Sequence, residues 1–201
     1  MTTPIKYEVR PAVDSDAKEL CSLLRESFYQ AFSKADGMSE SLLHDYFNEM
    51  LIEPKLKDSI ADPKHDYFVG AESEQSNKLG GMIQLRYPIS DLAGTGTGKG
   101  KDDEQEKEDQ KEEEKEDHKE VYLARLYLLP SSQGSGLASQ LFNKAQNHAK
   151  SLGYNKIKLD VWDGNARGIA FYEKIGFVKL YENKVEEDRF KRTDWIMRKE
   201  I

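Results

Sequence analysis

A glycine-rich turn between two strongly patterned segments most constrains the fold of this chain. The turn, PSSQGSGLAS at residues 130–139, follows the apolar run VYLARLYLLP, which is typical of a buried strand. From Leu137 onward the apolar residues recur at helical spacing. An ordinary turn needs one glycine, whereas this turn has both Gly134 and Gly136. The sequence therefore predicts a strand, a tight turn and a helix that begins beside two glycines.

Such a helix start is a favourable place for an anion. Its first turn has backbone N–H groups without intrahelical partners, and the peptide dipoles place about half a positive charge there. Glycines remove the side chains that would keep a phosphate from the backbone, while Ser135 and Ser139 add hydroxyl groups. The residues alone leave open the alternative that the two glycines only turn the chain.

A second segment, NARGIAFYEKIGF at residues 165–177, also predicts a helix. Asn165 is a suitable N-cap, and Gly176 is the residue type that ends a helix in a left-handed conformation. Ile169 and Tyr172 fall at helical spacing, so the residues alone favour Tyr172 as a core aromatic.

The remaining patterns predict an α+β domain. Asp14 and Ser39 are expected to cap two helices, and the second of these carries apolar residues from Leu42 to Leu51 on one face. Period-two and apolar runs predict strands near residues 7–11, 67–71, 80–87, 121–129, 156–162, 177–181 and 194–199.

The acidic balance of the chain belongs to one segment. Residues 101–120 hold 12 of the 37 acidic and 5 of the 30 basic residues, which accounts for the whole net charge of −7. Together with GTGTGKG before it, this run predicts a disordered, low-complexity insert at 91–119 within a single domain of residues 1–201. Because the rest of the chain is balanced in charge, we expect no nucleic-acid partner.

Several other site classes are disfavoured. GTGTGKG lacks the Ser or Thr that a phosphate loop has after its lysine, because Gly100 stands there. Cys21 is the only cysteine and the four histidines are widely spaced, so we expect no disulfide and no metal site. Without an apolar run of about 20 residues or an apolar leader, we expect a cytoplasmic protein without a membrane anchor, with nuclear access left open.

QGSGLA at 133–138 and N-x-x-x-x-A-F-Y-x-x-x-G-F at 165–177 together resemble the signature of the GCN5-related N-acetyltransferase (GNAT) superfamily. Gln133, Gly136 and Ala138 match its Gln/Arg-x-x-Gly-x-Gly/Ala pattern. The resemblance covers the chain except the insert, and ESFYQAF with LDVWDGNARGIAFYEKIGF is most similar to the spermidine/spermine acetyltransferase branch. It implies a mixed, mostly antiparallel sheet of six to seven strands, with helices on both faces and a V-shaped splay between strands four and five.

The resemblance also implies acetyl-CoA as co-substrate and assigns site residues. Tyr172 matches the tyrosine that protonates the departing CoA thiolate. The backbones of Leu126 and Leu128 are candidates for pairing with the pantetheine arm. The full set of expected coenzyme-binding residues is Leu126, Leu128, Gln133, Gly134, Ser135, Gly136, Leu137, Ala138 and Asn165.

The expected reaction is direct transfer of the acetyl group to a primary amine of a small molecule or peptide. A polyamine is the first hypothesis, because Glu26 and Asp45 would favour a cation. Polyamine-branch relatives often carry a glutamate at the position of Ala124, so the general base stays unassigned, with Glu120 and Asp160 as candidates. The alternative is an acetyl-CoA-binding platform without catalysis, docking basic partners through the acidic insert. A homodimer is left open.

Overall fold

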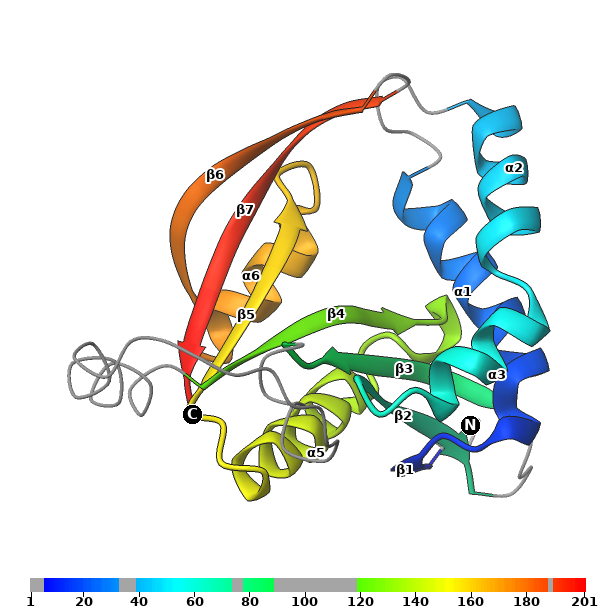
Figure 1. Cartoon of the computed structure of the whole chain (residues 1–201), viewed down its shortest axis with the longest axis horizontal. Coiled ribbons are helices and arrows are strands. Elements are labelled where there is room, and N and C mark those ends of the chain that lie inside the picture. The colour runs from blue at the N-terminus through cyan, green and yellow to red at the C-terminus, as the bar shows by residue number, and fades with distance from the viewer. Residues whose placement is uncertain (1–5, 33–38, 74–77, 89–118, 188–189) are drawn as a thin grey trace, which may run out of the picture.

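The computed structural model describes residues 6–32, 39–73, 78–88, 119–187 and 190–201. Its centre is a seven-stranded sheet in the order β1-β2-β3-β4-β5-β7-β6 (Figure 1). The strands are β1 (Tyr7–Pro11), β2 (His65–Glu72), β3 (Leu79–Arg86), β4 (Glu120–Leu128), β5 (Lys156–Trp162), β6 (Val178–Glu187) and β7 (Phe190–Glu200). Every neighbouring pair is antiparallel except β4 and β5, which are parallel. The predicted α+β class and mixed sheet are confirmed.

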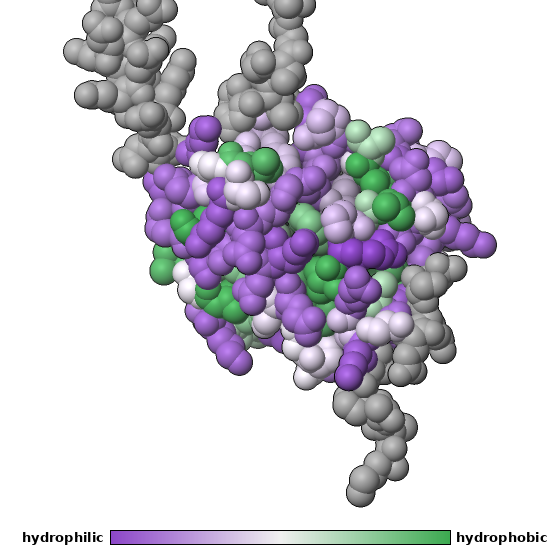
Figure 2. All heavy atoms as spheres, turned by 90° about the horizontal axis from the view of Figure 1, so that it is seen from below, coloured by the Kyte–Doolittle hydropathy of each residue, from purple (hydrophilic) through white to green (hydrophobic). Residues whose placement is uncertain are grey.

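Helices cover both faces of the sheet. The helices are α1 (Ala17–Phe32), α2 (Glu40–Met50), α3 (Glu53–Ala61), α5 (Leu137–Ser151) and α6 (Ala166–Lys174), with 3-10 turns η1 (Asp14–Asp16) and η3 (Pro130–Ser132). One buried cluster lies between the sheet and α5 and α6, with Phe142 and Leu159 among its members. A second lies between the sheet and α1 and α3, and includes Leu20 and Leu56. Seen from the α5 side, the surface is mainly hydrophilic, with small scattered apolar patches (Figure 2).

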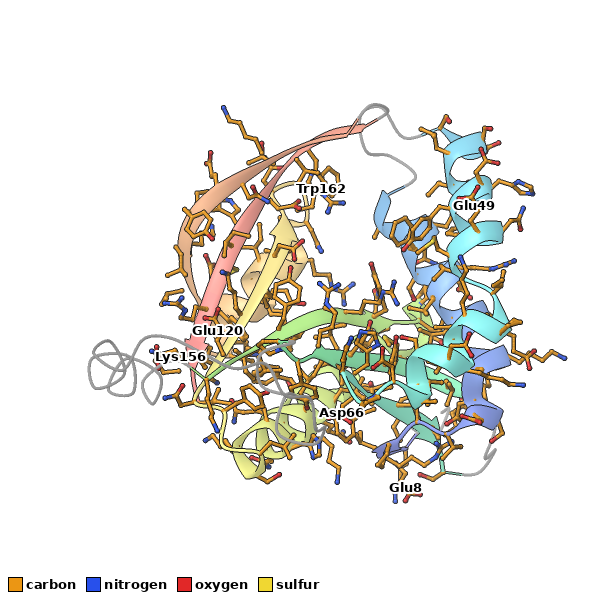
Figure 3. All side chains as sticks on the ribbon, viewed as in Figure 1. Glu8, Glu49, Asp66, Glu120, Lys156 and Trp162 are labelled. Carbon is orange, nitrogen blue, oxygen red and sulfur yellow. The ribbon has the colours of Figure 1, made fainter. Side chains whose placement is uncertain are left out.

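Strands β4 and β5 are paired over only three residues at one end. Their partners are Glu120 with Lys156, Val121 with Ile157, and Tyr122 with Lys158. Beyond this point β5 rises away from β4 (Figure 1), and Trp162 lies at the open end of β5, far from Glu120 and Lys156 (Figure 3). The expected splay between strands four and five is therefore present, and it leaves one edge of β4 without a neighbouring strand.

A β-bulge in β4 determines which side chains of this strand face α5 and which face α1. The register with β3 shifts between Gln84 and Leu85, so that Ala124 is the extra residue of β4. Leu123 before the bulge and Leu126 after it both pack on the α5 side, although they are an odd number of residues apart. Tyr127 consequently packs on the α1 side.

Several local expectations are confirmed. The Ser39 hydroxyl caps α2 by accepting a hydrogen bond from the Leu42 amide at 3.2 Å, and the Asn165 side chain caps α6 by accepting from the Gly168 amide at 2.9 Å. Gly176 follows α6 with a φ of 96°.

Other local expectations are wrong. Asp14 does not cap α1, because it lies within η1, which runs directly into the helix. Helix α3 was not predicted, and the last two strands are longer than expected. Met50 does not share the buried face of α2, because it is 47% exposed.

The predicted disordered insert lies outside the described residues except for Lys119. No helix in the described part of the chain is long and apolar enough to cross a membrane. The same described residues contain no group of three or more His, Cys, Asp and Glu side chains that could hold a metal ion.

Candidate active site

The turn before α5 presents backbone rather than side chains to its surroundings. Gly134 and Gly136 have φ values of 81° and 84°, and a methyl group added to either would meet no protein atom within 4 Å. The amides of Gly134, Gly136 and Ala138 have no hydrogen-bond partner among the described residues. The turn and the first turn of α5 therefore offer free N–H groups at a position that a ligand can approach.

Two of the predicted coenzyme-binding residues are used within the turn itself. The Ser135 hydroxyl donates to the Ser132 carbonyl at 2.6 Å and accepts from the Leu137 amide at 3.3 Å. The Leu137 side chain is fully buried beneath the sheet. Both residues shape the turn, and neither contributes to the lining of the cavity beside it.

A cavity of about 640 Å³ extends from this turn along β4, and we call it the turn cavity. Its walls come from α1, β4, the turn, the start of α5, and α6. The predicted residues that line it are Leu126, Leu128, Gln133, Gly134, Gly136, Ala138, Asn165 and Tyr172. Arg167 also lines it and donates a hydrogen bond to Gln133 Oε1. Arg167 could not be predicted from the sequence, since an exposed arginine in a first helical turn carries no signal of its own.

Leu126 and Leu128 lie where β4 has lost its second neighbour. On one side they pair with Ile83 and Gly81 of β3, and on the other side the ladder with β5 has already ended. Their side chains pack on the α5 side. On this free side the Ser27 hydroxyl donates to the Leu128 carbonyl at 3.4 Å, and no strand among the described residues pairs with it. An extended ligand lying in the turn cavity would therefore meet a backbone edge without a strand partner, as an added strand does.

Tyr172 is buried on α6 and lies at the inner end of the turn cavity. Its ring packs at 5.5 Å from the rings of both Phe171 and Phe177. Burial raises the pKa of the Tyr172 phenol well above its ordinary value, and the negative charge of Asp160 raises it further. The phenol is therefore protonated at every physiological pH and can act as a proton donor.

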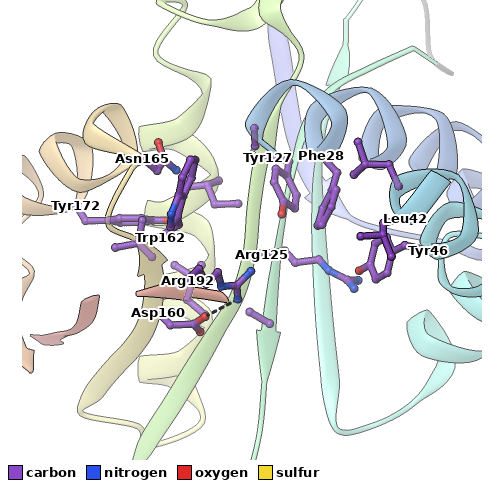
Figure 4. Close-up of a pocket in the computed structure, with 16 residues that line it drawn as sticks. Phe28, Leu42, Tyr46, Arg125, Tyr127, Asp160, Trp162, Asn165, Tyr172 and Arg192 are labelled. Carbon is purple, nitrogen blue, oxygen red and sulfur yellow. Dashed lines mark ion pairs between the residues drawn. The ribbon is translucent and has the colours of Figure 1, made fainter. Parts of the chain in front are cut away.

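A second cavity, of about 500 Å³, approaches Tyr172 from the α2 side of the sheet, and we call it the aromatic pocket (Figure 4). Phe28 of α1 and Tyr46 of α2 stack in one wall, with ring centroids 4.8 Å apart, and Trp162 lies in the opposite wall on β5. The residues that line both cavities are Ala31, Leu126, Tyr127, Asn165 and Tyr172. Two ligands entering from opposite sides would thus meet at Tyr172.

The aromatic pocket also contains charged side chains. Arg192 Nη2 lies 4.0 Å from Asp160 Oδ2, and Arg192 Nε donates to Asp194 Oδ2 at 2.9 Å. Burial raises the pKa of Asp194, and the nearby Arg192 opposes that shift. Arg125 extends from β4 into the same pocket (Figure 4). Arg125, Arg192 and the aromatic wall could not be predicted from the sequence, because they come from elements far apart in the chain.

The carboxylates considered from the sequence occupy different places. Glu120 lies at the paired end of β4, where it accepts from Arg198 Nε at 2.6 Å and lies 3.8 Å from Lys158 Nζ. Asp160 lines the aromatic pocket. Glu26 and Asp45 are exposed and line neither cavity, so the reason for expecting a polycationic acceptor does not hold for them.

Comparison with known proteins places these cavities in a family context. The model of the acetyltransferase (GNAT) family matches residues 18–177. The chain belongs to this family. An uncharacterized N-acetyltransferase from Lactobacillus delbrueckii subsp. lactis is 24% identical over 189 residues, covering 94% of both chains. The protein is accordingly an N-acetyltransferase by family, with a GNAT fold.

Solved structures show the same fold. The PaiA N-acetyltransferase of Thermoplasma acidophilum in complex with coenzyme A has a TM-score of 0.70 at 20% identity, covering 98% of this chain and 100% of that one. The spermidine/spermine N-acetyltransferase SpeG of Vibrio cholerae has a TM-score of 0.60 at 17% identity, covering 97% and 92%. At such low identity the likeness establishes the fold alone.

Proposed function

We propose that the protein transfers the acetyl group of acetyl-CoA directly to a primary amine bound in the aromatic pocket. The observation that carries this proposal is the meeting of two separate cavities at Tyr172, which allows both substrates to be bound at once. The co-substrate supplies an acetyl thioester, whose carbonyl carbon is open to attack by an amine. Because the acyl acceptor has its own route to Tyr172, the transfer needs no acetylated enzyme intermediate.

The groups that line the turn cavity suit the chemistry of acetyl-CoA. The free amides of Gly134, Gly136 and Ala138 would hold the pyrophosphate at the positive end of α5. The edge of β4 at Leu126 and Leu128, which has no strand partner on this side, would pair with the amide groups of the pantetheine arm. Gln133, held by Arg167, and Asn165, which caps α6, would border the arm on its way to Tyr172.

Tyr172 would donate its proton to the departing thiolate. A phenol with an ordinary pKa of 10 is only about 2 kcal/mol short of protonating a thiolate of pKa 8.5, and a raised pKa increases this gap while keeping the proton in place. The donation would accordingly assist departure as negative charge develops on sulfur. Tyr172 is only 9% exposed, which limits the access of water to its hydroxyl group.

The amine must also lose a proton before it can attack. For an alkyl amine of pKa about 10.4, deprotonation at pH 7 requires about 5 kcal/mol. Asp160 is a carboxylate that lines the aromatic pocket, and its charge acts on Tyr172. It is therefore the better placed of the two candidate bases, because Glu120 is held by Arg198 at the closed end of the strands.

The polyamine acceptor expected from the sequence is less well supported than acetyl transfer itself. The similarity to a spermidine/spermine N-acetyltransferase at 17% identity carries the fold only. Two arginines and one aspartate are the charged side chains among the described residues that line the aromatic pocket. A substrate with two or more ammonium groups would meet little opposite charge there.

The proposal is tested by thiol release from acetyl-CoA with purified protein and a panel of acceptors. The panel contains spermidine, spermine, simple monoamines, amino acids, and peptides with a free N-terminus or an internal lysine. Rapid release that depends on one class of amine is the expected result. Tight binding of acetyl-CoA without release for any acceptor would contradict the proposal and favour a non-catalytic platform.

A further inference from the structure

The acidic side chains beside the aromatic pocket already have a cationic partner. Arg192 lies between Asp160, at 4.0 Å, and Asp194, at 2.9 Å, so its guanidinium offsets both carboxylates. Asp194 is 1% exposed and lies behind the pocket rather than in its lining. Asp160 is the one acidic residue in the described lining of the pocket, and Arg192 already offsets part of its charge, so the pocket offers little attraction to a second ammonium group.

Arg125 is in the opposite situation. It lines the pocket and is half-buried, yet it forms no hydrogen bond or ion pair with any other part of the chain that the structure describes. The bulge at Ala124 places it on the α1 side of β4, together with Tyr127, instead of toward α5. In Figure 4 its side chain reaches across the pocket toward Tyr46.

The surroundings of Arg125 make an anion favourable there. Apart from Asp160, Arg192 and Asn165, the pocket is formed by aromatic and aliphatic side chains, such as Phe28, Leu42 and Leu123. An apolar environment strengthens a charge–charge interaction and makes an unpaired guanidinium costly. Guanidinium and carboxylate groups match in planar, two-pronged geometry. One unpaired guanidinium balances one negative charge, which fits a carboxylate better than a doubly charged phosphate.

We infer that the acceptor is a primary amine that also carries a carboxylate and an apolar body. Arg125 binds the carboxylate, the aromatic walls contact the apolar body, and the amine points toward Asp160 and Tyr172. This inference rests on the proposed acetyl transfer and narrows it to amino carboxylates, such as amino acids with large apolar side chains. Arg125 is thus a specificity-determining residue.

The test compares acceptors that differ only in the carboxylate. Thiol release from acetyl-CoA is measured with L-phenylalanine, 6-aminohexanoate, the carboxamide of each, the phosphonate analogue of phenylalanine, and spermidine. The variants are Arg125→Gln, Arg125→Lys and Arg86→Gln. Arg86 is a matched control, because it lies on the neighbouring strand β3 over the Tyr122 ring at 5.0 Å and lines neither cavity.

The informative quantity is the ratio of kcat/KM for each acid to that for its amide. The ratio is determined for each variant and then divided by the wild-type ratio. The difference in basicity between the acid and the amide is the same for every variant, so it cancels in this comparison. We expect the ratio to exceed 1 in the wild type for at least one pair. Arg125→Gln should reduce it about 10- to 100-fold, as expected for loss of a charge-assisted hydrogen bond. Arg125→Lys should reduce it less, and Arg86→Gln should leave it unchanged.

A second readout does not depend on turnover. Calorimetry of N-acetylphenylalanine and its amide, in the presence of CoA, should show a preference for the acid that Arg125→Gln removes. Thermal unfolding and CoA binding confirm that each variant is folded.

The outcomes separate the inference from the proposed function. Equal losses for acid and amide in Arg125→Gln, a preference for the phosphonate, or spermidine as the best acceptor would overturn the carboxylate assignment while leaving acetyl transfer intact. Absence of thiol release with every acceptor would overturn the proposed function itself.

Discussion

The guanidinium of Arg192 lies 4.0 Å from the carboxylate of Asp160. This pair connects β7 to β5 at the wall of the aromatic pocket, beside the buried Asp194. Asp160 lines the pocket in which the proposed acceptor amine would lose its proton. The positive charge of Arg192 offsets part of the negative charge of Asp160.

Replacing Asp160 tests its role as proton acceptor. Asp160→Asn should lower kcat about 10²-fold at neutral pH, within the range of a positioned general base, with little change in the Kd for CoA. The effect should shrink as the pH rises and the free amine becomes abundant. Glu120→Gln is the matched control, since Glu120 pairs with Arg198 away from both cavities, and it should leave kcat nearly unchanged. Equal losses in the two variants would exclude a special role for Asp160.

Removing the Tyr172 hydroxyl tests the proposed proton donor. Tyr172→Phe keeps the ring that packs against Phe171 and Phe177, so the fold should be preserved. We expect kcat to fall about 10²- to 10³-fold, while the Kd for acetyl-CoA changes little. Stopped-flow or steady-state thiol release with the best acceptor measures the first quantity, and calorimetry measures the second. Unchanged turnover would remove Tyr172 from the chemistry.

The local structure around the turn cavity, the proposed coenzyme site, could be predicted from the sequence because its signals are local. The strand, the glycine turn and the start of α5 lie within about 20 consecutive residues, and the Asn165 cap lies only a few residues before Tyr172 on α6. The caps at Ser39 and Asn165 follow from the hydrogen bonds that these side chains form with nearby amides. Each of these features depends on residues a few positions apart.

The aromatic pocket could not be predicted in the same way. Phe28, Tyr46, Arg125 and Arg192 come from four elements and meet only because β4 and β5 separate. The bulge at Ala124, which turns Arg125 toward α1, has no signature in VYLARLYLL. Helix α3 was missed because a single fully buried leucine, Leu56, gives too weak a periodic pattern between Pro54 and Pro63. Tertiary contacts, rather than local propensity, decide these parts.

Gly136 and Gly153 have the same φ, so comparing their alanine variants distinguishes the effect of backbone strain from an effect on ligand binding. Gly136 and Gly153 both have a φ of 84°, so Gly136→Ala and Gly153→Ala should each lower the free energy of unfolding by about 1–2 kcal/mol. Only Gly136 belongs to the turn cavity, where a methyl group would meet the ligand rather than protein. Gly136→Ala should therefore raise the Kd for CoA at least about 10-fold. Calorimetry with CoA measures this change, and a similar rise in Gly153→Ala would contradict the assignment of the turn.

The N-terminal part of the fold depends on a buried carboxylate whose contribution varies with pH. Asp16 is 6% exposed, and its two oxygens accept hydrogen bonds from Arg10 Nη1 at 2.7 Å and Nη2 at 2.8 Å. Its Oδ2 also accepts from the Val13 amide at 2.8 Å. Burial alone would raise the pKa of Asp16, but the hydrogen bonds from Arg10 and Val13 and the charge of Arg10 outweigh it, so that the pKa is lowered.

Because the folded-state pKa of Asp16 is lowered, its ionised carboxylate stabilises the fold fully at pH values above the ordinary carboxyl pKa of about 3.9. This stabilisation is lost as the pH falls through the lower, folded-state pKa. Asp16→Asn should therefore reduce the free energy of unfolding by about 1–3 kcal/mol at pH 7, and by less at pH 3. Urea unfolding at both pH values measures the difference. Asp14→Asn, an exposed neighbour in the same η1 turn, should change stability by less than about 0.5 kcal/mol. If Asp16→Asn lowered the free energy of unfolding equally at pH 3 and pH 7, Asp16 would stabilise the fold by packing and not through its ion pair with Arg10.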